Sequence, residues 1–187
     1  MTPRLTGEPP HRITPVIDIP TLTTDRLLLR AFRADDFEAY AAMMADPAVT
    51  RFLGDGKPQS RADAWRSMAF FLGHWGLRGF GIWAVEERAT GALAGRIGFL
   101  QPEGWPDFEL AYTLAPAFQG RGYAREGARA ALAYARDTLG RERVISLIRP
   151  ENAPSRRVAE SFGATVEQTL DFFGGPALVY VYPSTLP

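Results

Sequence analysis

The stretch PAFQGRGYAREGARAALAYA, residues 116–135, places two glycines and two arginines directly before an alanine-rich segment. Alanine recurs along that segment at a spacing that puts the side chains on one face of a helix. The alanines concerned are Ala124, Ala128, Ala131 and Ala135. Gly140 is a stop signal. The pattern therefore predicts a helix that packs on the core through small side chains and begins at a glycine-containing turn.

That turn has the features of an anion-binding site. DFELAYTL, residues 107–114, alternates as a strand does, so strand, turn and helix follow one another. The first N–H groups of a helix have no partners within it and lie at the positive end of its dipole. Gly120 and Gly122 would let phosphate oxygens approach, and Arg121, with Arg125, would add charge. A Gly-x-Gly turn is also common as simple chain geometry, so both interpretations stay open here.

The two common phosphate motifs do not fit this turn. A dinucleotide fingerprint needs G-x-G-x-x-G, but GRGYAR places Arg125 where the third glycine belongs. The strands before the turn also look antiparallel, whereas that fingerprint belongs to a parallel sheet. A P-loop needs G-K-[ST], which is absent.

Composition excludes several classes of function. The chain has 187 residues, which suits one domain, and its formal net charge of zero argues against a general electrostatic grip on nucleic acid. With no cysteine, disulfides, thiolate metal sites and a cysteine nucleophile are excluded. His11 and His74 alone make a poor metal site. No run of about 18 apolar residues suggests a membrane span.

The first twenty residues, MTPRLTGEPPHRITPVIDIP, contain five prolines and lack the apolar core of a signal peptide. We expect residues 1–20 to form a proline-rich arm and the chain to be cytoplasmic. Residues 21–187 are expected to form a single domain.

The remaining patterns predict a mixed α/β fold. Asp35 with Glu38 suggests a capping box for the first helix, and Pro47 marks its end. Ser60 is a candidate cap for the second helix, whose expected core face contains Trp65, Met68, Leu72 and Trp75. In chain order we expect a strand at 25–32, helices at 34–47 and 60–76, strands at 81–87, 92–101 and 107–114, the alanine-rich helix, a strand at 143–148, a helix at 152–164, and strands at 165–172 and 177–182.

Four segments together resemble the GCN5-related N-acetyltransferase (GNAT) superfamily. QGRGYA, 119–124, matches its acyl-CoA pyrophosphate loop, [QR]-x-x-G-x-[GA]. FELAYTLAPAFQGRGYAREG, 108–127, is similar to the E-[IL]-x-Y-x-L-x-P stretch of the ribosomal-protein N-acetyltransferase (RimJ/RimL-like) branch. TTDRLLLRAFRADDFEAY, 23–40, and NAPSRRVAESFGA, 152–164, resemble that branch's opening segment and its N-x-x-S-x-x-[VL]-x-E-x-x-G segment. The resemblance covers about residues 21–182.

The resemblance implies a mostly antiparallel, splayed central sheet with helices on both faces and an acyl-CoA N-acyltransferase domain at 21–187. Acetyl-CoA would be the cosubstrate, no metal would be needed, and an amine would attack the thioester directly. Backbone groups at the end of the fourth strand would hold the pantetheine arm, and the loop would hold the pyrophosphate. Matching the motifs to this sequence assigns the pantetheine contacts to Tyr112, Thr113 and Leu114. It assigns the pyrophosphate loop to Gln119, Gly120, Arg121, Gly122, Tyr123 and Ala124.

Glu109 is the best candidate for the general base. Strand alternation places it with Ala111 and Thr113 on one face, opposite Phe108, Leu110 and Tyr112. A carboxylate inside such an apolar run is costly to bury unless it is used or paired. A paired or edge-exposed structural glutamate remains the alternative.

At the position of the residue that would protonate the leaving thiolate, this sequence differs from the commonest family pattern. A tyrosine often lies seven residues after the asparagine of the last helix, but Ala159 occupies that position here. Ser155, in the N-x-x-S segment, is the alternative candidate, although serine is also common in a first helical turn. Asn152 is a good helix cap and, by resemblance, a contact to the pantetheine arm.

The acceptor side is less defined. Most of the aromatic residues are expected in the core, and a few in an acceptor slot. Without a dense acidic cluster, the acceptor is expected to be a peptide N-terminus or a small primary amine. No nucleic acid or membrane partner is expected, and the protein would be a monomer or homodimer. A non-catalytic acyl-CoA-binding or interaction domain on the same fold is the main alternative, and a nucleotide-binding module is a third.

Overall fold

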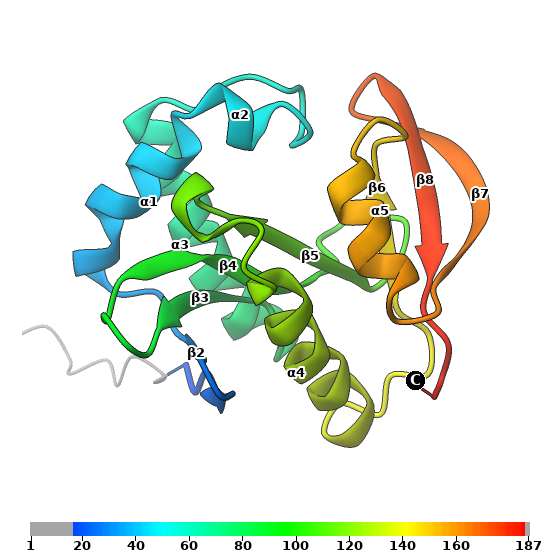
Figure 1. The fold of residues 1–187 in the computed structure, drawn as a ribbon, viewed down its shortest axis with the longest axis horizontal. Coiled ribbons are helices and arrows are strands. Elements are labelled where there is room, and N and C mark those ends of the chain that lie inside the picture. The colour runs from blue at the N-terminus through cyan, green and yellow to red at the C-terminus, as the bar shows by residue number, and fades with distance from the viewer. Residues whose placement is uncertain (1–16, 186–187) are drawn as a thin grey trace, which may run out of the picture.

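One open sheet of eight strands organises the part of the chain that the computed structural model describes, residues 17–185 (Figure 1). The order across the sheet is β1-β2-β3-β4-β5-β6-β8-β7, and every neighbouring pair is antiparallel except β5–β6. The strands are β1 (Leu22–Thr23), β2 (Leu27–Arg30), β3 (Ile82–Glu87), β4 (Leu93–Leu100), β5 (Glu109–Leu114), β6 (Ile145–Ile148), β7 (Thr165–Phe172) and β8 (Gly175–Val181). This confirms the predicted mixed α/β fold.

Helices cover both faces of the sheet. Helices α1 (Phe37–Met44), α2 (Pro47–Thr50) and α3 (Arg61–Arg78) lie on one face, and α4 (Tyr123–Asp137) and α5 (Ala153–Glu160) lie on the other (Figure 1). The alanine stripe of α4 behaves as predicted: Ala128, Ala131 and Ala135 are fully buried, while Ala124 is only partly buried at the end that faces the loop. Small side chains let α4 approach the sheet closely, because their volume adds little between helix and strands.

The sheet splays between β5 and β6. Glu109 and Ile145 form the one registered pair between these parallel strands in residues 17–185, and beyond Glu109 the strands diverge (Figure 1). Ser146 fills part of the opening, because its Oγ donates a 2.6 Å hydrogen bond to the carbonyl of Leu110. The residues from Ala111 to Leu114 therefore lack a strand partner on this side.

Two details of the first helices differ from the sequence prediction. The capping box at Asp35 and Glu38 is wrong, because the helix is preceded by a 3-10 turn and the backbone N–H of Arg33 donates to the Asp36 carboxylate at 2.7 Å. Glu38 instead pairs with Arg61 of α3. Pro47 does follow α1, but it also begins α2, which was not predicted; Asp46 caps this helix by accepting from Ala48 N.

The predicted core face of α3 is rotated relative to the observed one. Trp65 is 55% exposed and packs edge-on against Phe37, so it does not belong to the core stripe. The buried residues of α3 are Ala64, Met68, Phe71, His74 and Trp75. The spacing of Ala64, Met68, Phe71 and Trp75 is closer to 3.6 residues per turn than the spacing of the predicted face. Ser60 caps α3 as predicted, because its Oγ accepts from Asp63 N.

Most of the predicted arm, residues 1–20, lies outside the described residues. Residues 17–20 form neither helix nor strand. Ile19 packs against the core, and Trp83 Nε1 donates a 2.7 Å hydrogen bond to the carbonyl of Pro20. The division at residue 20 remains a prediction.

Candidate functional site

The loop between β5 and α4 has the backbone shape expected of an anion cradle. Gly120 and Gly122 have φ values of 73° and 81°, a region that residues with a Cβ rarely adopt. Gly122 is the N-cap of α4 and has no side chain to occupy the helix terminus. Gln119 Nε2 donates to the carbonyl of Leu114 at 2.9 Å, which closes the loop on itself. The N-terminal amides of α4 are therefore left for an external acceptor.

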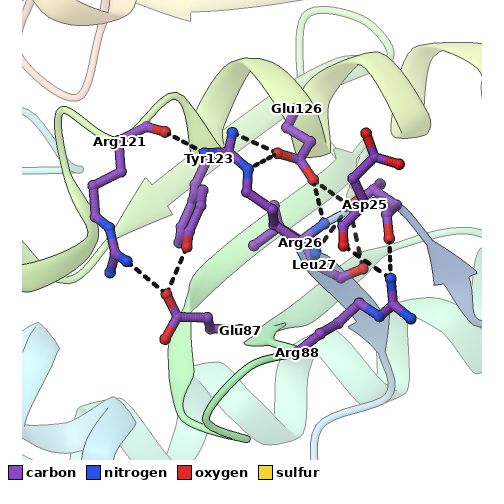
Figure 2. A network of polar contacts seen from close by, with 9 residues as sticks. Asp25, Arg26, Leu27, Glu87, Arg88, Arg121, Tyr123 and Glu126 are labelled. Atoms are coloured by element: carbon purple, nitrogen blue, oxygen red, sulfur yellow. Dashed lines mark hydrogen bonds and ion pairs between the residues drawn. The ribbon is translucent and has the colours of Figure 1, made fainter.

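The side chain of Arg121, which was expected to add charge to the anion site, instead contacts a carboxylate on the sheet. Its guanidinium pairs with Glu87 on β3 at 2.9 Å and stacks 4.9 Å from the ring centroid of Tyr123. The Tyr123 hydroxyl also donates to Glu87, so both side chains reach the same carboxylate on β3 (Figure 2). Among the loop residues, the cleft is lined by Gln119, Gly120, Gly122, Tyr123, Ala124 and Arg125.

A carboxylate beneath the loop fixes the start of α4 (Figure 2). Glu126 accepts hydrogen bonds from Thr24 Oγ1 at 2.6 Å, Arg26 N at 2.8 Å and Arg26 Nε at 2.6 Å. Arg26 Nη1 then donates to the carbonyl of Arg121 at 3.0 Å. The segment before β2 is thereby tied both to the first turn of α4 and to the loop. Desolvation raises the pKa of Glu126, but the bonds from Thr24 and Arg26 outweigh it and lower the pKa overall.

Replacing Glu126 by glutamine should weaken this tie. The charge-assisted bonds to Arg26 are lost, so we expect the free energy of unfolding to fall by about 2 kcal/mol. Urea denaturation at neutral pH measures it. Glu38→Gln is the matched control, because the Glu38–Arg61 pair is exposed and should contribute hardly at all. Equal stability of Glu126→Gln and the wild type would show that the network does not stabilise the loop.

A cleft of about 590 Å³ lies between the two halves of the splayed sheet. One wall consists of β5 and the start of α4, and the other consists of α5. The segment after α2 contributes Phe52 and Leu53. Residues of the predicted set that line the cleft are Tyr112, Thr113, Leu114, Gln119, Gly120, Gly122, Tyr123, Ala124, Asn152 and Ser155. The structure thus brings the predicted loop, strand end and last helix together around one space.

A second, smaller cavity of about 150 Å³ adjoins the cleft. Phe52, Leu53, Tyr112, Thr113, Asn152 and Ser155 line both, so the two spaces meet at the point where β5 and β6 part. Glu109 lies in the wall of the smaller cavity, together with Trp105, Arg96 and Arg149. A molecule in the cleft and another in the cavity would face each other beside Tyr112 and Ser155.

Glu109 is buried, with 7% of its surface exposed, and it forms part of the lining of the smaller cavity. Trp105 Nε1 donates to its Oε2 at 2.7 Å, and Leu147 N donates to Oε1 at 3.3 Å. Desolvation raises the pKa of Glu109 from 4.5 to about 7, although these bonds and the charge of Arg96 oppose the shift. A carboxyl group with this pKa exchanges its proton readily at neutral pH. Glu109 is not edge-exposed, and within residues 17–185 it is paired by hydrogen bonds from Trp105 and Leu147 and not by a salt bridge, which is compatible with either a structural or a catalytic role.

The α5 side of the junction contains Asn152 and Ser155. Asn152 Oδ1 accepts from Ser155 N at 3.3 Å, so Asn152 caps α5 and the Ser155 hydroxyl is not needed for that purpose. Tyr112 crosses from β5 and donates its hydroxyl to the Ser155 carbonyl at 2.9 Å. Burial raises the pKa of the Tyr112 phenol. Ala159, which stands where a tyrosine is common, is fully buried in the core.

Sequence reasoning missed several residues at this site. Trp105 was grouped with the aromatic residues, without its hydrogen bond to Glu109. Phe52 and Leu53 follow a helix that was not predicted, so nothing marked them as lining residues. Arg96 lies within an apolar strand, and an interrupting charge of the kind that singled out Glu109 could have found it. Within residues 17–185 no group of three His, Asp or Glu side chains could hold a metal ion.

Residues 26–165 match the family model described as an acetyltransferase (GNAT) domain, and the chain belongs to this family. YnaD, an uncharacterised N-acetyltransferase of Bacillus subtilis, is 32% identical over 142 residues, which are 76% of this chain and 81% of YnaD. The crystal structure of an acetyltransferase from Agrobacterium tumefaciens superposes with a TM-score of 0.80 at 35% identity, covering 88% of this chain and 95% of the other. The protein is therefore an acetyltransferase.

RimJ of Mycobacterium smegmatis, solved in complex with CoA-disulfide, shares the fold with a TM-score of 0.69 at 19% identity, covering 83% of this chain and 80% of RimJ. No helix in residues 17–185 combines the length and apolar character needed to cross a membrane.

Proposed function

We propose that this protein transfers the acetyl group of acetyl-CoA to a primary amine in a single direct step. The observation that supports this most strongly is the junction of the two cavities, where Tyr112 and Ser155 line both spaces and Glu109 lies in the wall of the smaller one. The larger cleft suits CoA, and the smaller one suits the amine. The RimJ fold neighbour solved with CoA-disulfide is consistent with CoA binding by this fold.

In the proposed complex the pyrophosphate lies on the N–H groups of Arg121, Gly122, Tyr123 and Ala124, at the positive end of α4. The pantetheine arm runs along the unpaired edge of β5 at Tyr112 and Thr113. The carbonyl of Leu114 contributes less than expected, because Gln119 already donates to it. Asn152 borders the arm from α5. This arrangement delivers the thioester to the junction without a metal.

In the reaction, the amine nitrogen forms a bond to the thioester carbonyl carbon and the carbon–sulfur bond breaks. Glu109 takes one proton from the ammonium group, directly or through a water molecule, and later releases it to solvent. As the carbon–sulfur bond breaks, Ser155 gives its hydroxyl proton to the CoA thiolate and regains a proton from the nitrogen that becomes the amide. Holding both substrates in one orientation supplies much of the rate enhancement. The chain has no cysteine, so an acetyl-cysteine intermediate is excluded.

A panel of peptides with free N-termini and small primary amines, incubated with acetyl-CoA, tests this proposal through released CoA thiol. We expect release that depends on both enzyme and amine. Acetyl-CoA binding in calorimetry without thiol release for any amine would instead favour a non-catalytic acyl-CoA-binding domain. The segments at 23–40, 108–127 and 152–164 favour the RimJ/RimL-like branch within the family.

Replacing Gly122 by valine should weaken CoA binding. Valine disfavours a φ of 81° and would place a branched side chain beside the amides that are proposed to hold the pyrophosphate. The free loop is expected to relax out of this strained conformation, so that re-forming it for CoA costs about 1–3 kcal/mol, a roughly tenfold or larger rise in the Kd for CoA, measured by calorimetry. Gly140→Val is the matched control, because Gly140 has a φ of 60° beyond the opposite end of α4. A folded Gly122→Val protein with wild-type CoA affinity would contradict the loop assignment.

A further inference from the structure

The smaller cavity contains a buried cation, Arg96, that forms no salt bridge within residues 17–185. Arg96 on β4 is only 9% exposed, and its Nε is buried with no hydrogen-bond partner among the described residues. Its guanidinium lies 4.9 Å from the ring centroid of Phe71 and forms no ion pair within residues 17–185. Burying a charged group without hydrogen-bonded partners is costly, and such groups are expected to have a functional explanation. The unpaired guanidinium therefore points to a ligand that supplies an anion.

Arg96 faces the same space as Glu109. It is in register with Thr113, which shares a face of β5 with Glu109, and it lines the same cavity. The influence of its charge on the pKa of Glu109 agrees with this placement. An acceptor amine beside Glu109 could thus extend a second polar group toward Arg96 without leaving the cavity.

The balance of charge around the cavity favours an anionic acceptor. Two guanidinium groups, Arg96 and Arg149, line it, and Glu109 supplies the one carboxyl group. Arg149 donates to the carbonyls of Pro176 and Gly54, not to a carboxylate, so its charge is not neutralised there. Polycationic amines would meet repulsion in this space, whereas an acceptor with a carboxylate would be attracted.

Much of the remaining lining is apolar, with Ser146, Asn152 and Ser155 among its polar members, and the space is small. Phe52, Leu100, Trp105, Phe172 and Phe173 contribute side chains to a cavity of about 150 Å³. Trp105 packs edge-on against Phe172, with ring centroids 4.8 Å apart. A compact apolar group fits such walls, but a continuing peptide chain would have to pass them.

On the basis of the proposed function, we propose that the acceptor is a small amino acid with a free carboxylate and an apolar side chain, and that Arg96 binds this carboxylate. The planar guanidinium suits bidentate recognition of a carboxylate. The amine of the same molecule would then lie toward Glu109 and the thioester. Arg96 is thereby a specificity-determining residue.

The test compares leucine and phenylalanine with their decarboxylated amines, 3-methylbutylamine and 2-phenylethylamine, and with leucinamide. Released CoA thiol gives kcat/KM for each. We expect the wild type to prefer each amino acid, and Arg96→Met to reduce that preference by about 10- to 10²-fold, the scale of a charge-assisted hydrogen bond. Comparing the preference between proteins cancels differences in amine basicity. Arg96→Lys should retain part of the preference.

Methionine fills the space of the arginine stem, and thermal unfolding checks that the variant is folded. Arg136→Met, on the exposed face of α4, is the matched control and should keep the wild-type preference. Acetylation of the amines with no preference for the amino acids would overturn this inference and leave the proposed function intact. An equal loss on both substrate types in Arg96→Met would also overturn it, because Arg96 would then be structural. Acetyl-CoA binding with no amine acetylated would overturn the proposed function itself.

Discussion

Glu109→Gln should lower kcat/KM by about 10²-fold or more at pH 7, on the scale of general-base catalysis. The wild-type profile should rise with pH through about 7, where Glu109 loses its proton. In the glutamine variant that inflection should disappear, and the remaining activity should follow the ionisation of the amine at higher pH. The deficit should therefore shrink in alkaline solution. A pH–rate profile of both proteins with one acceptor measures this.

Two controls separate catalysis from folding. Because the folded-state pKa of Glu109 lies above its ordinary value of 4.5, its contribution to stability is complete below that pH and decreases as pH rises through about 7. Glutamine removes this ionisation, so the variant should lose less stability than the wild type between pH 4.5 and about pH 7, the two pKa values that bound the shift. Glu103→Gln, at an exposed position in the β4–β5 connection, should keep wild-type activity. A wild-type pH–rate profile in Glu109→Gln would make Glu109 structural.

Ser155→Ala should lower kcat by about 10- to 10³-fold if its hydroxyl protonates the leaving thiolate. The affinity for acetyl-CoA should change little, because Asn152 caps α5 and the serine hydroxyl is not required there. Stopped-flow thiol release and calorimetry measure the two quantities. Ser184→Ala, near the end of the described chain and exposed, is the matched control.

The phenol of Tyr112 is the competing acid at the same junction, because it lines both cavities. Its hydroxyl already donates to the carbonyl of Ser155, so transferring that proton would break an existing bond. We therefore expect Tyr112→Phe to affect kcat less than Ser155→Ala. The opposite order, or a wild-type kcat in Ser155→Ala, would reject Ser155 as the acid.

The order of helices and strands could be predicted from sequence because each has a strong period. The alanine stripe of α4 and the strand expected at 107–114 are examples, and both elements are confirmed, although burial along β5 does not alternate because both of its faces are covered. Short elements without a full period were missed, namely β1 and α2. The buried face of α3 was predicted wrongly because Trp65 was expected in the core, whereas it lies at the surface and packs edge-on against Phe37.

The candidate site could be predicted from sequence only where the backbone conformation requires a particular residue type. The glycines at 120 and 122 mark a loop with positive φ, and that loop is where the sequence placed it. Hydrogen-bond and ion-pair partners of side chains could not be predicted in this way, because they depend on contacts between segments that are distant in the sequence. Arg121 pairs with Glu87 from β3, and Glu109 accepts from Trp105 of a neighbouring loop. The approach of Arg96 to the same cavity as Glu109 likewise follows only from the register of β4 on β5.

Direct transfer from acetyl-CoA to an amine is tested most directly by following both products in one sample. Wild-type enzyme is incubated with acetyl-CoA, with and without an amino acid acceptor, while mass spectrometry records the acceptor and the intact enzyme, and a thiol reagent records CoA. We expect thiol release and acetylated acceptor to appear in equal amounts, only when the amine is present, with no acetylated enzyme. Thiol release without acetylated acceptor, or an acetyl-enzyme that forms before the amine is added and then passes its acetyl group on, would contradict direct transfer.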